Sequence, residues 1–173
     1  DHVVVCGTDE VIALIRQCAF HPETIEIHSL RDGEEVDEWE TVMTIEGDYA
    51  DFAHLETIYL GILARQSRIA TNVRRVVKAA NGKPVLFFPA RYDIYQTQES
   101  DGYAALVGGI HGFSTDANAL AAGGKGLGTI PHALIASYKG DTVAATEAFD
   151  KYVDPSIARI ALVDFDNDCV NTS

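Results

Sequence analysis

One apolar run, which breaks at a proline and presents a single histidine, decides the fold: Gly128-Thr129-Ile130-Pro131-His132-Ala133-Leu134-Ile135. Leu127–Ile130 predicts a strand, and the residues from His132 onward have a helical pattern. His132 therefore lies where a strand ends and a helix begins. In parallel α/β sheets and barrels, side chains at the carboxyl ends of strands form the functional rim. His132 is thus a candidate functional residue, with helix capping or core packing as the alternative.

The same order, a short strand followed by polar residues, recurs along the second half of the chain. Further strands are predicted at Val85–Phe88, Ile110–Phe113 and Ile160–Val163, with helical segments between them, as in βα repeats. The polar residues past the four strand ends are Arg91, Ser114 with Thr115, His132, and Asp164 with Asp166. Because the strand ends of a parallel α/β barrel converge, we expect these side chains to surround one hollow.

The residue types at these strand ends suit an anionic, phosphorylated substrate. A guanidinium binds carboxylate or phosphate with two parallel hydrogen bonds, hydroxyls hold further oxygens, and paired carboxylates can hold Mg²⁺. Each candidate has a simpler alternative. Arg91 could pair with Asp93, Ser114 or Thr115 could cap the following helix, and residues 164–168 could form an ordinary turn, since they lack the glycine and distal glutamate of a calcium loop.

Two other functional motifs are weak. The glycine-rich run 123–128 matches neither common phosphate-loop pattern and precedes a strand, so we interpret it as a flexible connection. A serine hydrolase is disfavoured because Ser114 lies in Gly-Phe-Ser-Thr-Asp rather than in a Gly-x-Ser-x-Gly turn.

Before residue 84 the pattern is different. Strands are predicted at Ile25–His28 and Thr41–Ile45, and a long helical stretch at Asp48–Ala80. We therefore divide the chain into an α+β segment, residues 1–83, and the first strand–helix units of a barrel, residues 84–173.

Composition and charge restrict the partners and the cellular compartment that we expect for the protein. The 173 residues carry a formal net charge of −13, which argues against nucleic acid as a partner, and no apolar run is long enough to suggest a membrane span. The arginines and lysine between residues 65 and 78 fall on several helix faces, and we interpret them mainly as solvated surface, with a local anion or subunit contact as the alternative. The cysteines number three and are widely spaced, which suits reduced thiols in the cytoplasm.

Five stretches together resemble a known family. They are Glu56–Thr71, Phe88-Pro89-Ala90-Arg91-Tyr92, Gly108–Ser114, Gly128–Leu134 and Leu162-Val163-Asp164. In this order they resemble nicotinate phosphoribosyltransferases of the shorter archaeal and bacterial form, and the similarity covers Val3 to Asp168. The resemblance implies a type II phosphoribosyltransferase fold, in which an α/β-sandwich domain is followed by an irregular, here truncated, α/β barrel.

The resemblance also implies a reaction. Nicotinate and phosphoribosyl pyrophosphate, with ATP as co-substrate and Mg²⁺, would give nicotinate mononucleotide and pyrophosphate in NAD biosynthesis. By position, Phe88 resembles the aromatic residue that stacks on the pyridine ring, and Arg91 the arginine near the base and phosphate. Ser114 and Thr129 resemble hydroxyl residues beside the base. His132 resembles the histidine that ATP phosphorylates.

The last group of residues concerns the ribose and the metal. Asp164 resembles an acid near the ribose and Mg²⁺, and with Asp166 it is the candidate metal pair. Pro89, Tyr92 and the residues after Asp164 depart from the family pattern, so nicotinamide or quinolinate remains open as the base, as does a homologue that binds a metabolite without turnover. The resemblance also implies a homo-oligomer that completes its sites across subunits, and we expect these residues to be only part of the complete enzyme.

Overall fold

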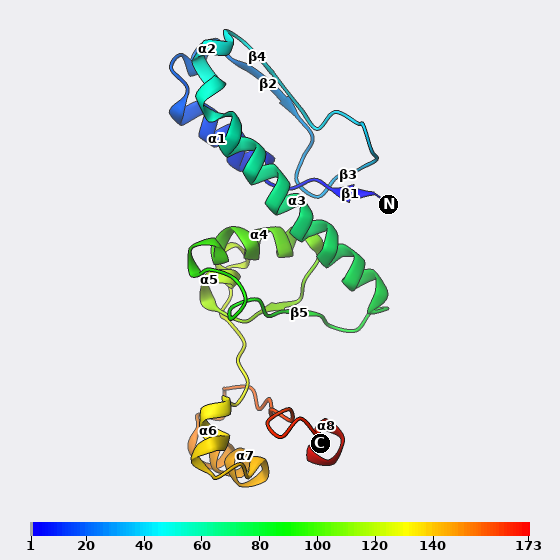
Figure 1. The fold of residues 1–173 in the computed structure, drawn as a ribbon, viewed down its shortest axis with the longest axis vertical. Coiled ribbons are helices and arrows are strands. Elements are labelled where there is room, and N and C mark those ends of the chain that lie inside the picture. The colour runs from blue at the N-terminus through cyan, green and yellow to red at the C-terminus, as the bar shows by residue number, and fades with distance from the viewer. Residues whose placement is uncertain (1) are drawn as a thin grey trace. The chain divides into compact units, whose positions relative to one another are not determined.

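The structure is a computed structural model that describes residues 2–173. The chain forms two compact units, a first unit that ends at Gly126 and a second unit, Leu127–Ser173. Figure 1 shows the elements of each unit along the chain. The predicted α/β class is confirmed. The division at residue 83 concerns domains of the family fold and stays a prediction.

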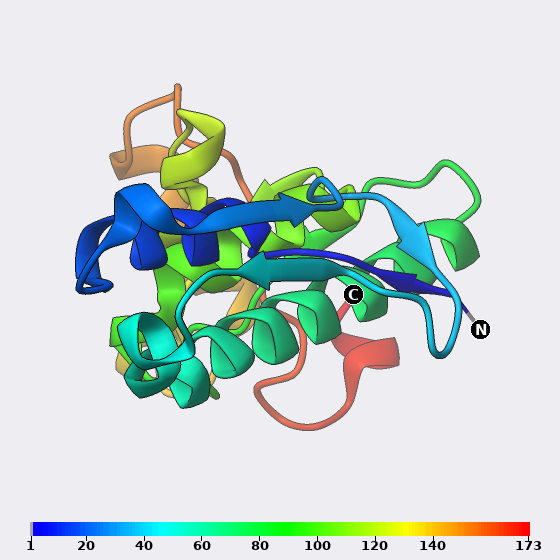
Figure 2. The same cartoon turned by 90° about the horizontal axis from the view of Figure 1, so that it is seen from above.

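The first unit begins with an α+β layer made of two antiparallel strand pairs and a helix. Its elements are β1 (Val3–Val4), α1 (Thr8–Cys18), η1 (Pro22–Thr24), β2 (Glu26–Ser29), β3 (Glu35–Val36) and β4 (Met43–Glu46). β1 pairs with β3, and β2 pairs with β4 in a register that places Ile27 opposite Ile45. Figure 2 shows β2 and β4 side by side. The apolar alternation of both strands faces a core with Val11, Ile15 and Phe52.

A long helix continues from this layer. The segments are α2 (Tyr49–Phe52), η2 (Ala53–Leu55) and α3 (Glu56–Ala79). Asp48 caps α2, since its carboxylate accepts a hydrogen bond of 3.0 Å from the Ala50 amide. The predicted end of the helical stretch is confirmed, because Asn81 and Gly82 follow α3 with φ of 48° and 82°, a conformation that stops a helix.

A strand–helix–strand motif follows α3 within the first unit. It consists of β5 (Leu86–Phe87), η3 (Tyr95–Thr97), α4 (Gln98–Gly108) and β6 (Gly112–Phe113), after which α5 (Asp116–Ala119) and η4 (Leu120–Ala122) complete the first unit. β5 and β6 are parallel, with Leu86 opposite Gly112 and Phe87 opposite Phe113. Val73 of α3, Ala105 of α4 and Phe113 share one buried cluster. The predicted βα repeat is therefore formed at these two strands.

The regular elements of the second unit are helices. It contains α6 (His132–Ser137), α7 (Thr142–Tyr152) and α8 (Cys169–Thr172), with Ile130, Ile135 and Ala145 in its buried cluster. The strands predicted at Leu127–Ile130 and Ile160–Val163 are not formed. These runs do meet, because the Ile130 amide donates to the Ile160 carbonyl at 3.0 Å. A strand requires a repeated ladder of such bonds, which these residues lack in the described structure.

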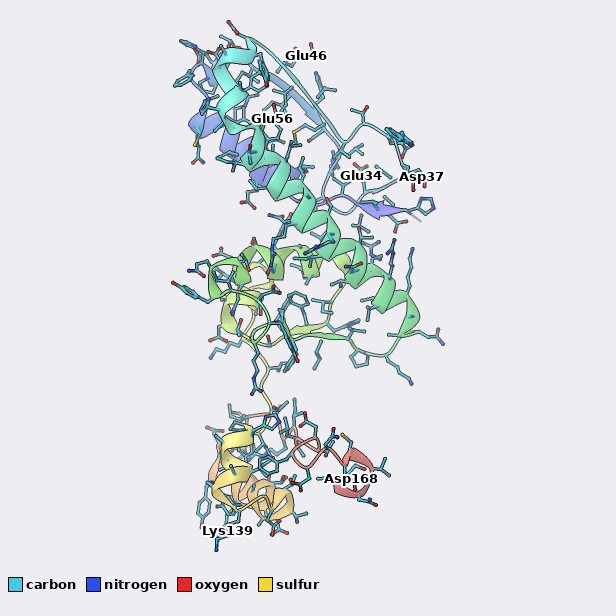
Figure 3. All side chains as sticks on the ribbon, in the orientation of Figure 1. Glu34, Asp37, Glu46, Glu56, Lys139 and Asp168 are labelled. Carbon is cyan, nitrogen blue, oxygen red and sulfur yellow. The ribbon has the colours of Figure 1, made fainter. Side chains whose placement is uncertain are left out.

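The surface carries much of the acidic charge. Figure 3 shows Glu34, Asp37, Glu46 and Glu56 distributed over the outside of the first unit rather than gathered at one place. Glu56 is exposed and accepts a hydrogen bond of 2.9 Å from the Tyr49 hydroxyl. No helix within residues 2–173 combines the length and the apolar character needed to cross a membrane.

The cysteines differ in their environments, which gives a first prediction. Cys6 is fully buried, and burial, followed by the charge of Asp32, raises the pKa of its thiol from 9.0 to about 12. Three pKa units lower the thiolate fraction about a thousandfold. Ellman's reagent at pH 8 is therefore expected to modify exposed Cys18 and Cys169 rapidly and Cys6 only after denaturation. Rapid loss of all three thiols in the native protein would contradict the buried position of Cys6.

Candidate active site

The carboxyl ends of β5 and β6 bring two candidate residues to one edge. Phe88 follows β5 and Ser114 follows β6, and the parallel register makes their positions equivalent. The Ser114 amide donates to the Phe87 carbonyl at 2.9 Å, which fixes both strand ends. Phe88 is 42% exposed, so a face of its ring can stack on a planar ligand. This edge can therefore hold an aromatic ring beside a hydroxyl.

Arg91 lies in a tight turn directly after β5. The amides of Tyr92 and Asp93 both donate to the Pro89 carbonyl, at 2.8 and 3.1 Å. The alternative pairing of Arg91 with Asp93 is not formed, because Asp93 instead accepts from Arg65 at 3.4 Å. The Arg91 side chain is exposed and makes no hydrogen bond or ion pair with another residue in the described structure. Its guanidinium is therefore available to bind a carboxylate or a phosphate.

The hydroxyls after β6 serve partly as helix caps. Thr115 is the N-cap of α5, and its hydroxyl accepts from the Asn118 amide at 3.1 Å. The capping alternative is therefore confirmed for Thr115. The Ser114 hydroxyl donates to the side-chain carbonyl of fully buried Asn118 at 3.3 Å, and Asn118 in turn donates to the Gln98 carbonyl at 2.7 Å. Ser114 thus presents its oxygen lone pairs from a fixed position.

His132 and Asp164 meet in the second unit. His132 is the first residue of α6, with Pro131 at the N-cap, and its Nε2 lies 3.3 Å from Oδ1 of Asp164. Both side chains are partly exposed, at 39% and 58%. Nδ1 of His132 is buried and has no hydrogen-bond partner among the described residues. A charged His132 would therefore form an ion pair with Asp164 through Nε2.

Thr129 and Asp166 complete the candidate set in the second unit. The Thr129 hydroxyl is half-buried and donates to the Ile130 carbonyl at 3.2 Å. Asp166 is exposed, two residues beyond Asp164. No three His, Cys, Asp or Glu side chains gather as a metal site in the part of the chain that the structure describes. A Mg²⁺ ion that is bound chiefly by phosphate oxygens needs only one or two carboxylates, which Asp164 and Asp166 could supply.

The candidate residues therefore form two groups, one in each unit. Phe88, Arg91 and Ser114 belong to the first unit, and His132 and Asp164 belong to the second. The convergence of both groups on one hollow stays a prediction.

An ion pair that the sequence analysis missed lies beneath the Arg91 turn. Arg65 of α3 donates to both carboxylate oxygens of Asp101 in α4, through Nε and Nη2, at 2.7 Å each. Asp101 is fully buried, and its hydrogen bonds raise the pKa of the Arg65 guanidinium further above its usual value. Thus Arg65, interpreted from sequence as solvated surface, holds a buried charge. An aspartate beside the small apolar residues of α4 was the available signal.

One cleft of the first unit is acidic. It measures about 600 Å³ and is lined mainly by Asp9, Glu10, Gln96, Glu99 and Tyr103. Burial, followed by the hydrogen bond from its hydroxyl to Asp32, raises the pKa of Tyr103. Because its carboxylates would repel a phosphate, this cleft does not suit the expected anionic substrate.

Comparison with known proteins gives one matching family model and several similar solved structures. Residues 1–67 match the family model described as quinolinate phosphoribosyl transferase, N-terminal domain. The structure of nicotinate-nucleotide pyrophosphorylase from Pyrococcus furiosus superposes with a TM-score of 0.86 at 37% sequence identity, over 99% of this chain and 42% of that protein.

Two more distant structures share the fold. Nicotinate-nucleotide pyrophosphorylase from Francisella tularensis has a TM-score of 0.64 at 19% identity, over 99% of this chain and 59% of that protein. Human nicotinic acid phosphoribosyltransferase has a TM-score of 0.65 at 16% identity, over 82% of this chain and 34% of that protein. The chain thus spans between about a third and three fifths of the length of these three proteins.

Proposed function

We propose from its relationship to the type II phosphoribosyltransferases that the protein containing this chain transfers phosphoribose to a pyridine carboxylate. Residues 1–67 match the quinolinate phosphoribosyl transferase N-terminal domain, which supports this relationship. The observation that carries the proposal is the grouping of Phe88, Arg91 and Ser114 around the carboxyl ends of two parallel strands. An exposed ring, a free guanidinium and a fixed hydroxyl match the planar, anionic shape of such a base.

Quinolinate is the favoured base, because the family model that matches is a quinolinate phosphoribosyl transferase domain. The ring nitrogen forms a bond to C1 of the phosphoribosyl group and pyrophosphate leaves. For quinolinate to yield nicotinate mononucleotide, the carboxylate next to the ring nitrogen must also leave as CO₂, and the ring carbon that it leaves must take up a proton from solvent. Arg91 would bind a carboxylate of the base while Phe88 stacks on the ring.

Nicotinate is the second candidate, and Arg91 is the observation that favours it. Among the described residues that follow β5 and β6, Arg91 supplies one guanidinium that has no ion-pair partner. One guanidinium suits the single carboxylate of nicotinate. In this candidate His132, whose Nε2 lies near Asp164, would accept the terminal phosphoryl group of ATP, and ADP would leave.

Mg²⁺ belongs to the proposal for either base. When bound, it would neutralise charge on the leaving pyrophosphate. Asp164 and Asp166 are the carboxylates that would hold it, together with phosphate oxygens of phosphoribosyl pyrophosphate.

We expect the protein to be a homo-oligomer in the cytoplasm. Size-exclusion chromatography with light scattering tests the oligomeric state.

Product analysis of the full-length gene product tests the proposed reaction. The enzyme would be incubated with phosphoribosyl pyrophosphate, Mg²⁺ and either base, with and without ATP, and nicotinate mononucleotide would be measured by chromatography. Quinolinate turnover should release one labelled CO₂ per nucleotide and need no ATP. Nicotinate turnover should release none and be faster with ATP. Absence of nucleotide from both bases would refute the proposal.

Substitution of Arg91 tests its role in binding the base. Arg91→Lys keeps the charge but loses the two parallel hydrogen bonds, so the KM for the base is expected to rise about tenfold, equivalent to about 1.4 kcal/mol. Arg68→Lys is the matched control, because Arg68 is an exposed arginine of α3 and should leave KM unchanged. An unchanged KM in Arg91→Lys would remove Arg91 from the site.

Substitution of His132 tests the coupling to ATP. If nicotinate is the base, His132→Ala should abolish the increase in rate that ATP gives and retain the slower reaction without ATP. His28→Ala, which removes an exposed histidine from β2, serves as the control. Stimulation by ATP that survives in His132→Ala would exclude phosphorylation of this residue.

A further inference from the structure

The turn that presents Arg91 is connected to a buried charge by a short chain of contacts. Asp101 is fully buried in α4 and accepts two hydrogen bonds of 2.7 Å from Arg65. Nη2 of the same guanidinium lies 3.4 Å from Oδ1 of Asp93. The Asp93 amide donates to the Pro89 carbonyl, which closes the turn around Arg91. Arg65 therefore joins the buried aspartate to the turn.

Thr97 strengthens this connection at the start of α4. Its hydroxyl lies 2.9 Å from Oδ2 of Asp101, 3.3 Å from Nη2 of Arg65 and 3.1 Å from the Ile94 carbonyl. The two ends of the segment between Asp93 and Thr97 are thus both held by the Arg65 guanidinium. A planar guanidinium with five donors in fixed directions can hold several oxygens in one arrangement, which a lysine cannot do.

We propose that Arg65 is a positioning residue for substrate binding: anchored on Asp101, it holds Asp93 and thereby fixes the turn that presents Arg91. This inference rests on the proposed function for the role of Arg91 in binding the base. The role of Arg65 is indirect, because it acts through Asp93 and the turn. Small displacements of a substrate-holding group have large effects on binding and rate, so a fixed turn has functional value.

Asp93 offers a clean test, because its side chain is 40% exposed and its loss leaves no buried charge. In Asp93→Asn, simple electrostatics and positioning predict opposite results. Removal of a negative charge near Arg91 should strengthen the binding of an anionic base. A neutral amide oxygen accepts a hydrogen bond from the Arg65 guanidinium less strongly than a carboxylate does, so the turn should loosen and the same binding should weaken. We expect the dissociation constant for the base, measured by calorimetry on the full-length protein, to increase about fivefold.

Two further variants complete the design. Glu99→Gln removes one negative charge from an exposed position in the first turn of α4 and should not weaken base binding. Asp93→Glu keeps a carboxylate that can accept from Arg65 and should recover most of the affinity. Tighter or unchanged binding in Asp93→Asn would overturn the positioning role.

A second readout does not depend on the proposed function. The amides of Tyr92 and Asp93 should exchange with solvent faster in Asp93→Asn than in the unchanged protein, and Glu99→Gln should leave them unaffected. If neither base binds the unchanged protein, the proposed function fails while this measurement still decides whether Arg65 holds the turn. Exchange that is unchanged in Asp93→Asn would overturn the inference.

Discussion

Replacement of Arg65 by methionine is expected to lower the free energy of unfolding by about 3–5 kcal/mol. The reason is the partner that remains. Asp101 is 0% exposed and would keep a carboxylate with no guanidinium to compensate its charge. Methionine keeps an apolar side chain of similar length, so the loss reports the uncompensated charge of Asp101 rather than lost side-chain volume. Urea unfolding followed by circular dichroism would give the value.

Two controls separate the buried charge from general damage to α3. Arg68→Met removes an exposed arginine from the same helix and is expected to change stability by less than about 0.5 kcal/mol. The double variant Arg65→Met/Asp101→Leu removes both charges and should recover a large part of the loss, because replacement of a buried pair by apolar groups is often neutral. A loss below about 1 kcal/mol in Arg65→Met would show that water reaches Asp101.

Gly102→Ala is expected to destabilise the first unit by about 3 kcal/mol or more. A Cβ atom at Gly102 would lie 2.0 Å from the Asn118 carbonyl oxygen, where α4 packs directly against the backbone of α5. Alanine favours a helix over glycine by only about 1 kcal/mol, so the steric conflict should dominate. The midpoint of urea unfolding would fall, and Asn118 would be displaced from its hydrogen bonds to Thr115 and Gln98.

Gly61→Ala provides a matched control, since Gly61 lies within α3 and a Cβ there would meet nothing within 4 Å. It should stabilise the protein by about 0.5–1 kcal/mol. Equal effects of the two substitutions would mean that α4 and α5 are less closely packed than the structure shows.

Periodicity predicted the elements that are stabilised by local pattern. The alternation in β2 and β4, the apolar spacing of α3 and the stop at Asn81 and Gly82 are all readable over short distances. Leu127–Ile130 and Ile160–Val163 are short runs with apolar residues, from which strands were predicted as for β5, yet they form no strands. A strand depends on a neighbour that supplies a complete ladder, and this information is not in the run itself.

The candidate site likewise combines residues that a local pattern predicts with a pairing that depends on tertiary packing. The parallel pairing of β5 and β6 places the residues that follow these strands at one edge, as the strand-end rule expects. His132 and Asp164, whose Nε2 and Oδ1 atoms lie 3.3 Å apart, meet although neither residue follows a strand in the described structure. The pairing of Arg65 with Asp101 spans 36 positions and joins two helices. Helical spacing defines which face each residue occupies, but not which face of another helix it meets. Tertiary packing therefore decided what the arginines of α3 do.

The course of α3 has a consequence for how the protein could be dissected. At about 1.5 Å per residue, its 24 residues extend for about 36 Å. Its first half packs through Tyr59 and Leu63 against the core of the α+β layer, and its second half packs through Val73 against β6. The family match ends at residue 67, in the middle of this helix. A fragment cut there would lose half of the helix and expose apolar surface on the remainder, so we expect the two parts to unfold in one cooperative step and neither to be a useful expression fragment.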